Sequence, residues 1–267
     1  MPTAWFGILI VGFVAGVLSG MFGIGGGVVI VPVLIIFLEF STTQATSTSL
    51  AALLMPVAIF AVLEYHRKKL IDVRAAALIA LGLLITSWVG ASIAIALPGD
   101  ILKQVYGAFL LYMSWRFIEP RQVYFIWQAK RTGIEPPAVK ATNITAPPNT
   151  SPIVPLGIGL VAGIASGMFG IGGGAVIVPA LVGFFNYDQK LAVGTSLGAL
   201  LLPVGLPGVL RYGAEGLLDI PVALLMAVGL VMGAFFGARI ALGLPSKTVK
   251  QLYGVFLVFV ALRFIFG

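Results

Sequence analysis

Two glycine clusters are the residues most able to do chemistry in this chain. Residues 19–32 read SGMFGIGGGVVIVP and residues 166–179 read SGMFGIGGGAVIVP, an offset of 147 residues. Three consecutive glycines before an apolar helix let backbone N–H groups converge, and the positive end of the helix dipole attracts an anion. The pattern predicts two anion-binding loops, Gly23 to Gly27 and Gly170 to Gly174. The alternative is that the glycines only permit close helix packing.

Hydroxyl side chains recur near the clusters at the same offset. Ser19 and Ser166 precede the glycines, and a Thr-Ser pair follows at 48–49 and again at 195–196. Hydroxyls can donate hydrogen bonds to an oxyanion without the desolvation cost of a fixed charge. Alternatively, Ser and Thr bond back to their own helix carbonyls.

An amide side chain also recurs, at Gln104 and Gln251, beside Lys103 and Lys250. A lysine at a helix start more often reaches to the membrane interface than binds substrate. The predicted substrate-binding residues are Ser19, Gly23, Gly25, Gly26, Gly27, Thr48, Ser49, Gln104, Ser166, Gly170, Gly172, Gly173, Gly174, Thr195, Ser196 and Gln251.

Composition indicates that these residues are held in an all-α polytopic membrane protein. The 267 residues are 60% hydrophobic and 9% charged, with a mean hydropathy of +1.10, whereas a soluble domain carries about 25% charged residues. The net charge of +7 gathers in short loops, which suits orientation by cytoplasmic positive charge and gives no reason to expect a nucleic-acid partner. With no cysteine, one histidine and no clustered acid–base or metal-ligand set, we expect no enzyme activity, metal or cofactor.

The repeated offset predicts a duplicated unit. It holds without a gap from about Gly12 to Phe117. We therefore divide the chain into a first transmembrane repeat (1–118), a cytoplasmic linker with an interfacial segment (119–152) and a second transmembrane repeat (153–267).

Apolar segments give the expected helices of each repeat. In the first they cover 5–20, 28–38, 43–64, 74–97 and 101–118. The last three can cross a bilayer, which takes roughly 20 residues, but the second would rise only about 16 Å. We expect three full transmembrane helices plus a broken or re-entrant pair that holds the glycine loop inside the membrane. Such a break survives only where protein or a water-filled cavity surrounds it.

Charge placement predicts that the repeats have inverted topology. Basic residues follow the third segment at 66–74 and the fifth at 121–140, which places both loops in the cytoplasm. In the second repeat, the loop that matches 66–69 is Gly213 to Gly216, and positive charge appears at Lys190 and Lys247 instead. Paired interrupted segments in inverted halves predict a midplane binding site.

Other motifs have structural interpretations. Glycines four residues apart suit one packed helix face, as at 12, 16 and 20, at 159, 163 and 167, and at 229, 233 and 237. Asp72 and Asp219 are predicted helix N-caps. Pro56 and Pro203 are predicted to kink their helices, and Arg239 is predicted to anchor the inner end of its helix or to act as a gate.

SGMFGIGGG followed by VVIVP, then TSL and a downstream Asp72 or Asp219, in two copies, resembles the sulfite exporter TauE/SafE family. The resemblance implies a permease for sulfite, thiosulfate, sulfoacetate or other sulfonates in a prokaryotic inner membrane. Gly216 stands before the second Asp loop where the first has Lys69, a departure that concerns loop geometry.

We therefore expect a secondary transporter that binds a small anion between the two glycine loops. The alternatives are an anion channel with the same site, uptake rather than export of a small organic anion, and a membrane-bound enzyme or assembly factor. The expected partners are the anion and the lipid bilayer, and homo-oligomerisation is left open.

Overall fold

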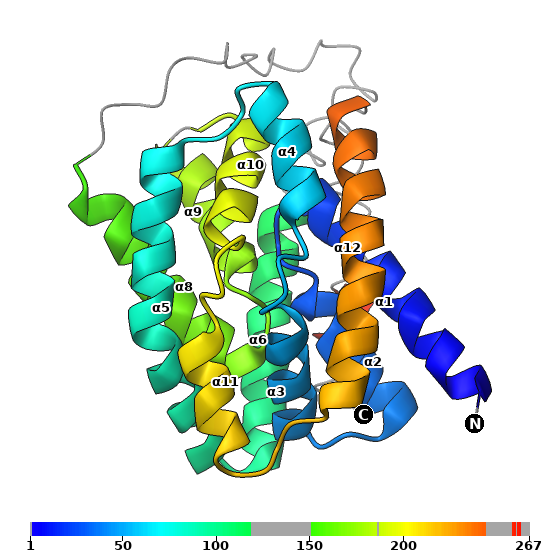
Figure 1. The fold of residues 1–267 in the computed structure, drawn as a ribbon. Coiled ribbons are helices and arrows are strands. Elements are labelled where there is room, and N and C mark those ends of the chain that lie inside the picture. Colours follow the sequence, from blue (N-terminus) through cyan, green and yellow to red (C-terminus); the bar gives the residue numbers. More distant parts are fainter. Residues whose placement is uncertain (1, 119–150, 186, 244–257, 260, 263–267) are drawn as a thin grey trace, which may run out of the picture.

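The computed structural model describes residues 2–118, 151–185, 187–243, 258–259 and 261–262, and it has no β-strand within them (Figure 1). The helices of the first half are α1 (Pro2–Phe22), α2 (Gly27–Leu38), α3 (Thr42–Ala52), α4 (Ile59–Arg67), α5 (Val73–Ala96) and α6 (Gly99–Ile118). Those of the second half are α8 (Ile153–Phe169), α9 (Gly174–Phe185), α10 (Gln189–Ala199), α11 (Leu206–Gly213) and α12 (Ile220–Gly243).

Among the described residues, three helices are long and apolar enough to cross a membrane, and neither α6 nor α8 is one of them. The three are Trp5–Phe22 within α1, Val73–Ala96 and Ile220–Gly243. Large apolar side chains on the outer faces of α5 and α12 are about half exposed, among them Ile85, Trp88, Val228 and Met232. An outer surface of this kind suits lipid rather than water.

The two halves pack through two equivalent pairs of helices, each pair with one helix from either half. The most extensive contacts join α1 to α12 and α5 to α8, and the 147-residue offset converts one pair into the other. A methyl group added at Gly16 would lie 2.8 Å from the Cα of Leu230, and one added at Gly163 would lie 2.8 Å from the carbonyl oxygen of Leu83. The predicted packing glycines are confirmed, because these backbones approach too closely for a side chain.

The third apolar segment of each half differs from the prediction. The run 43–64 is not one helix with a kink but two helices, because α3 ends at Ala52 and α4 begins at Ile59. Pro56 has no N–H to continue the helix, and its ring would clash with the preceding turn. The second half breaks in the same way around Pro203, between α10 and α11.

The first segment also differs. It was expected to be half of a re-entrant pair, but α1 has 21 residues and its apolar part is long enough to span. The following helix α2 has 12 residues, and in the second half the equivalent helices α8 and α9 have 17 and 12 residues. Each half therefore has two interruptions, one at the glycines and one at the proline.

Asp72 and Asp219 begin the long helices of the two halves. Asp72 Oδ1 accepts a hydrogen bond from the N–H of Ala75 at 3.0 Å, and Asp219 Oδ1 accepts one from the N–H of Val222 at 3.1 Å. Both predicted N-caps are confirmed.

Candidate functional site

Both glycine clusters interrupt the helix with backbone that favours glycine. Gly23, Gly25 and Gly26 have φ values of 70°, 82° and 78°. Gly170, Gly172 and Gly173 match them at 66°, 74° and 87°. These values lie in the left-handed region, where a side chain is strained. The predicted non-helical breaks are therefore confirmed.

The two breaks meet each other. A methyl group added at Gly27 would overlap the carbonyl oxygen of Gly170 and lie 2.7 Å from the Cα of Ile171. One added at Gly174 would overlap the carbonyl oxygen of Gly23 in the same way. The structure thus brings the glycine loops of the two halves into direct contact.

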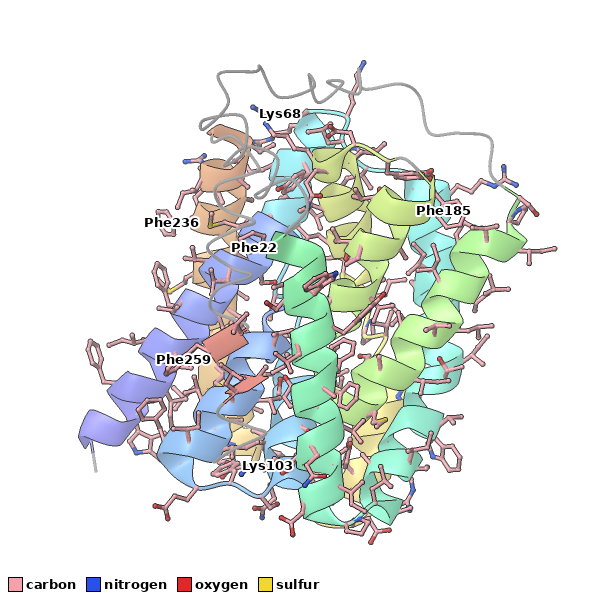
Figure 2. All side chains as sticks on the ribbon, turned by 180° about the vertical axis from the view of Figure 1, so that it is seen from behind. Phe22, Lys68, Lys103, Phe185, Phe236 and Phe259 are labelled. Atoms are coloured by element: carbon pink, nitrogen blue, oxygen red, sulfur yellow. The ribbon has the colours of Figure 1, made fainter. Side chains whose placement is uncertain are left out.

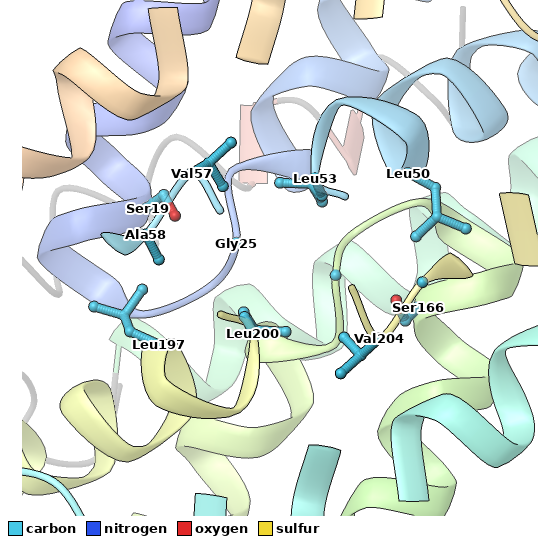
Figure 3. A pocket seen from close by; sticks show the side chains of 12 residues that line it. Ser19, Gly25, Leu50, Leu53, Val57, Ala58, Ser166, Leu197, Leu200 and Val204 are labelled. Carbon is cyan, nitrogen blue, oxygen red and sulfur yellow. The ribbon is translucent and has the colours of Figure 1, made fainter. Parts of the chain in front are cut away.

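A small cavity lies where the loops meet (Figure 3). We call it the central cavity. Its twelve lining residues form six pairs separated by 147 residues, so each half contributes the same six positions. The pairs are Ser19 with Ser166, Gly25 with Gly172, Leu50 with Leu197, Leu53 with Leu200, Val57 with Val204, and Ala58 with Gly205.

The polar side chains of the central cavity are two serines. Ser19 is 2% exposed and Ser166 is 1% exposed. The Ser166 hydroxyl has no hydrogen-bond partner among the described residues. A buried hydroxyl without a partner is costly, and it commonly marks a place where a ligand or water binds.

Carbonyl groups around the breaks are already occupied by hydroxyls from the other half. Ser49 Oγ donates to the carbonyl oxygen of Gly170 at 2.8 Å, and Ser196 Oγ donates to that of Gly23 at 2.6 Å. One turn earlier, tyrosines of the same half approach the helix carbonyls, since Tyr212 donates to Gly167 at 2.8 Å and Tyr65 approaches Gly20 at 3.5 Å.

The amide groups of the breaks have no such partners. Within the described residues, the N–H groups of 25–28 and 172–175 donate no hydrogen bond. Such orphan donors are expected at the start of a helix. Acceptors near the cavity are thus satisfied while donors remain available, which favours a negatively charged guest.

The other predicted residues lie around the loops rather than in the cavity. Thr48 Oγ1 accepts from the N–H of Asp219 at 3.2 Å, and Thr195 Oγ1 accepts from that of Asp72 at 3.0 Å. Gln104 is exposed on α6. Gln251 lies outside the described residues. The structure therefore brings together Ser19, Ser166 and the glycines, with the Thr-Ser pairs behind them.

Replacing Ser49 or Ser196 by alanine is expected to lower the free energy of unfolding by about 1–2 kcal/mol each. Each change leaves a buried loop carbonyl without its donor. Ser92→Ala is the matched control, because the buried Ser92 hydroxyl has no partner among the described residues and its loss should cost little. Unfolding in mixed micelles measures all three variants. Equal stability of Ser49→Ala and Ser92→Ala would show that the hydrogen bond from Ser49 to the loop carbonyl does not stabilise the fold.

Sequence reasoning missed the apolar walls and the tyrosines. The leucines and valines of the central cavity lie in apolar runs that give no local sign of a binding site. Tyr65 and Tyr212 did carry a signal, because they are identical residues at the 147-residue offset. The proline breaks bring the walls inward, since Leu53, Val57, Leu200 and Val204 lie at or beside them.

The two ends of the molecule differ in their side-chain contacts between halves. Tyr187 OH donates to Asp72 Oδ2 at 2.8 Å, and Arg239 Nε pairs with Glu64 Oε1 at 3.2 Å. The offset places Phe40 opposite Asp219, and Phe40 has no hydroxyl. Phe40 and Asp219 instead border a surface pocket that Gln44 also lines.

Comparisons with known proteins agree with the architecture. A family model described as Sulfite exporter TauE/SafE matches residues 8–264. A probable membrane transporter protein of Methanocaldococcus jannaschii is 28% identical over 257 residues, which cover 91% of this chain and 88% of the relative. One from Bacillus subtilis is 25% identical over 269 residues, covering 97% and 96%. One from Haemophilus influenzae is 26% identical over 277 residues, covering 96% of each.

No solved structure gives a significant match. The family match spans nearly the whole chain, including both glycine breaks and both long helices that pack against them. The chain is therefore a membrane protein and belongs to the sulfite exporter TauE/SafE family.

Proposed function

We propose that this protein is a secondary transporter of small sulfur-containing oxyanions such as sulfite, thiosulfate or organosulfonates, which bind in the central cavity. The observation that carries the proposal is the imbalance of hydrogen-bonding groups there. The Ser166 hydroxyl and the loop amides lack partners among the described residues, while the loop carbonyls are occupied. Family membership supports transport of such anions.

The predicted site residues then divide into two roles. Ser19, Ser166 and the N–H groups of residues 25–27 and 172–174 are the proposed ligands of the anion. Ser49, Ser196, Thr48 and Thr195 are proposed to position the loops, because their hydroxyls bond to backbone of the other half. Exposure on α6 removes Gln104 from the proposed ligand set.

The proposed placement is an inner membrane, with the two halves inverted. Equivalent helices lie at opposite ends, since α4 and α10 share the upper end in Figure 1 while α3 and α11 share the lower end. Lys68 lies at one end of the molecule and Lys103 at the other (Figure 2). Positive charge in the loop 66–69 supports a cytoplasmic position for the first of these ends. The joining segment 119–152, almost wholly outside the described residues, is still predicted to be cytoplasmic.

A carrier mechanism is favoured over a channel by the size of the cavity. Its volume is about 20 Å³, which holds about one water molecule. An oxyanion of four or more heavy atoms needs more room, so the halves must move apart to admit it. The interactions of Tyr187 with Asp72 and of Arg239 with Glu64 join the halves at the end assigned to the cytoplasm. We propose that they hold this end closed, and that rocking of one half on the other opens it.

Tyr187→Phe is expected to favour opening at the cytoplasmic end, because it removes the hydroxyl that joins the halves. A hydrogen bond to a carboxylate of this kind should shift the equilibrium by about tenfold. The chain has no cysteine, so Ala58→Cys in the cavity supplies a single reactive thiol. Its labelling by an impermeant maleimide in inside-out vesicles should accelerate. Tyr112→Phe, which alters an exposed tyrosine on α6, is the control. An unchanged labelling rate in Tyr187→Phe would show that the hydrogen bond between Tyr187 and Asp72 does not hold the cytoplasmic end closed.

Flux into proteoliposomes tests the proposed function. Radiolabelled sulfite or methanesulfonate should enter with saturating kinetics, and unlabelled anion inside should drive counterflow of the labelled form. Gln104→Ala should behave like the wild type. Conductance at ion-channel rates in planar bilayers would favour the channel, and absence of flux for every sulfur oxyanion would refute the proposal.

A further inference from the structure

We propose that the central cavity selects singly charged oxyanions, such as hydrogensulfite or a short alkanesulfonate, over doubly charged ones such as sulfate. This inference rests on the proposed function and narrows its substrates to the singly charged ones, which excludes thiosulfate because it carries two negative charges at neutral pH. Its starting observation is that none of the twelve lining residues is ionisable.

The positive potential in the cavity therefore comes from partial charges. The helices α2 and α9 both begin at the glycine breaks and have 12 residues each. Each helix start is equivalent to roughly half an elementary charge. The carbonyls at the ends of α1 and α8 accept hydrogen bonds from the hydroxyls of Ser49, Ser196 and Tyr212, which reduces their repulsion of an anion. The two starts together thus match about one negative charge.

A second observation points to a ligand at the same place. The Ser166 hydroxyl is 1% exposed, lines the cavity and has no partner among the described residues. Ser19 faces the same space from the other half (Figure 3). Both hydroxyls are neutral donors, so they can stabilise an oxyanion without adding a compensating charge.

The desolvation cost and the attraction to dipoles depend differently on the charge of the anion, and this difference favours a monoanion over a dianion. The cost of removing an ion from water grows with the square of its charge, whereas its attraction to fixed dipoles grows in direct proportion. A dianion therefore meets about four times the desolvation cost of a monoanion of equal size, for about twice the attraction. Without a lysine or arginine in the wall, this excess has nothing to offset it.

The apolar walls favour an organic substituent on the anion. Leu53 and Leu200 lie beside the glycine loops, and Val57 and Val204 line the same cavity. A methyl group placed against these side chains loses nothing, while a fourth charged oxygen there would have no donor. Charge and shape thus point to the same class of ligand.

Three probes of similar tetrahedral shape test the inference: dimethyl sulfone, methanesulfonate and sulfate, which carry no charge, one and two negative charges. Binding to the full-length protein in detergent is measured by calorimetry at constant ionic strength. Methanesulfonate should bind at least about tenfold more tightly than either of the others. Sulfate binding as tightly as methanesulfonate would overturn the charge selection while leaving the anion site in place. Binding of none of the three would refute the site itself, and with it the proposed function.

A substitution in the wall provides a second measurement. Leu53→Lys places a cation next to Gly172, since Leu53 Cδ1 lies 3.1 Å from the position of a methyl group added there. The ratio of sulfate to methanesulfonate affinity should rise by about tenfold or more. Leu53→Met, of similar length and neutral, should keep the wild-type ratio. An unchanged ratio in a folded Leu53→Lys protein would show that charge does not determine selectivity.

Discussion

Replacing Ser19 and Ser166 together by alanine will weaken anion binding by orders of magnitude while the protein stays as stable as the wild type. A hydrogen bond to a charged acceptor contributes about 1.5–3 kcal/mol, so loss of both should weaken binding by roughly two to four orders of magnitude. Stability should not fall, because the Ser166 hydroxyl has no partner among the described residues that its removal could leave unsatisfied.

Calorimetry with sulfite and unfolding of the same preparations measure the two effects separately. Ser49→Ala provides the opposite pattern, since its hydroxyl bonds to the carbonyl of Gly170 rather than lining the cavity. That variant should lose stability, and its affinity for the anion should fall only if the glycine loop is displaced. Wild-type affinity in the double serine variant would exclude these hydroxyls as ligands, and a parallel loss of stability would make them structural.

Gly27→Ala and Gly174→Ala will each prevent formation of the stable folded protein. The added methyl group would overlap a carbonyl oxygen of the facing loop and lie 2.7 Å from a Cα, that of Ile171 or of Ile24. Backbone atoms cannot rotate aside as a side chain can, and the loops are fixed on both sides. We expect a loss of about 3 kcal/mol or more in each variant.

Gly157→Ala is the matched control for both glycine variants. This glycine lies in α8, and an added methyl group would meet no atom within 4 Å. Because alanine favours the helix, the variant should be unchanged or more stable by about 0.5–1 kcal/mol. The yield of monodisperse protein in gel filtration and unfolding in mixed micelles compare the three. Full yield and stability of Gly27→Ala would show that the loops are further apart than their contact implies.

The features that were predictable from the sequence are those set by local chemistry or by the repeat itself. Consecutive glycines force a break because only they accept positive φ in succession, and the structure has those breaks at both clusters. Glycines spaced by four residues specify a helix face, and Asp72 and Asp219 stand where the N-cap of a helix is expected. The 147-residue offset also makes each of these features appear twice.

The features that could not be predicted depend on which half faces which. Ser49 and Ser196 look the same in sequence whether they line a path or bond to a backbone carbonyl, and only the packing of the halves sends them to Gly170 and Gly23. The helix breaks at Pro56 and Pro203 could not be read from hydropathy, because the residues around each proline are apolar and continue the hydrophobic run. The missing N–H of proline ends the helix without changing that run. The walls of the cavity are formed by those breaks, so they were hidden as well.

Because the longest helices of each half pack mainly against helices of the other half, neither half has a complete core of its own. The main partner of α1 is α12, and that of α5 is α8, so a polypeptide that ended after α6 would expose bare glycine stripes where a neighbour belongs. Two separate copies of one half could satisfy each other through the same pairings. Joining two such halves in one chain keeps these pairings and allows equivalent positions to differ, as Phe40 and Tyr187 do.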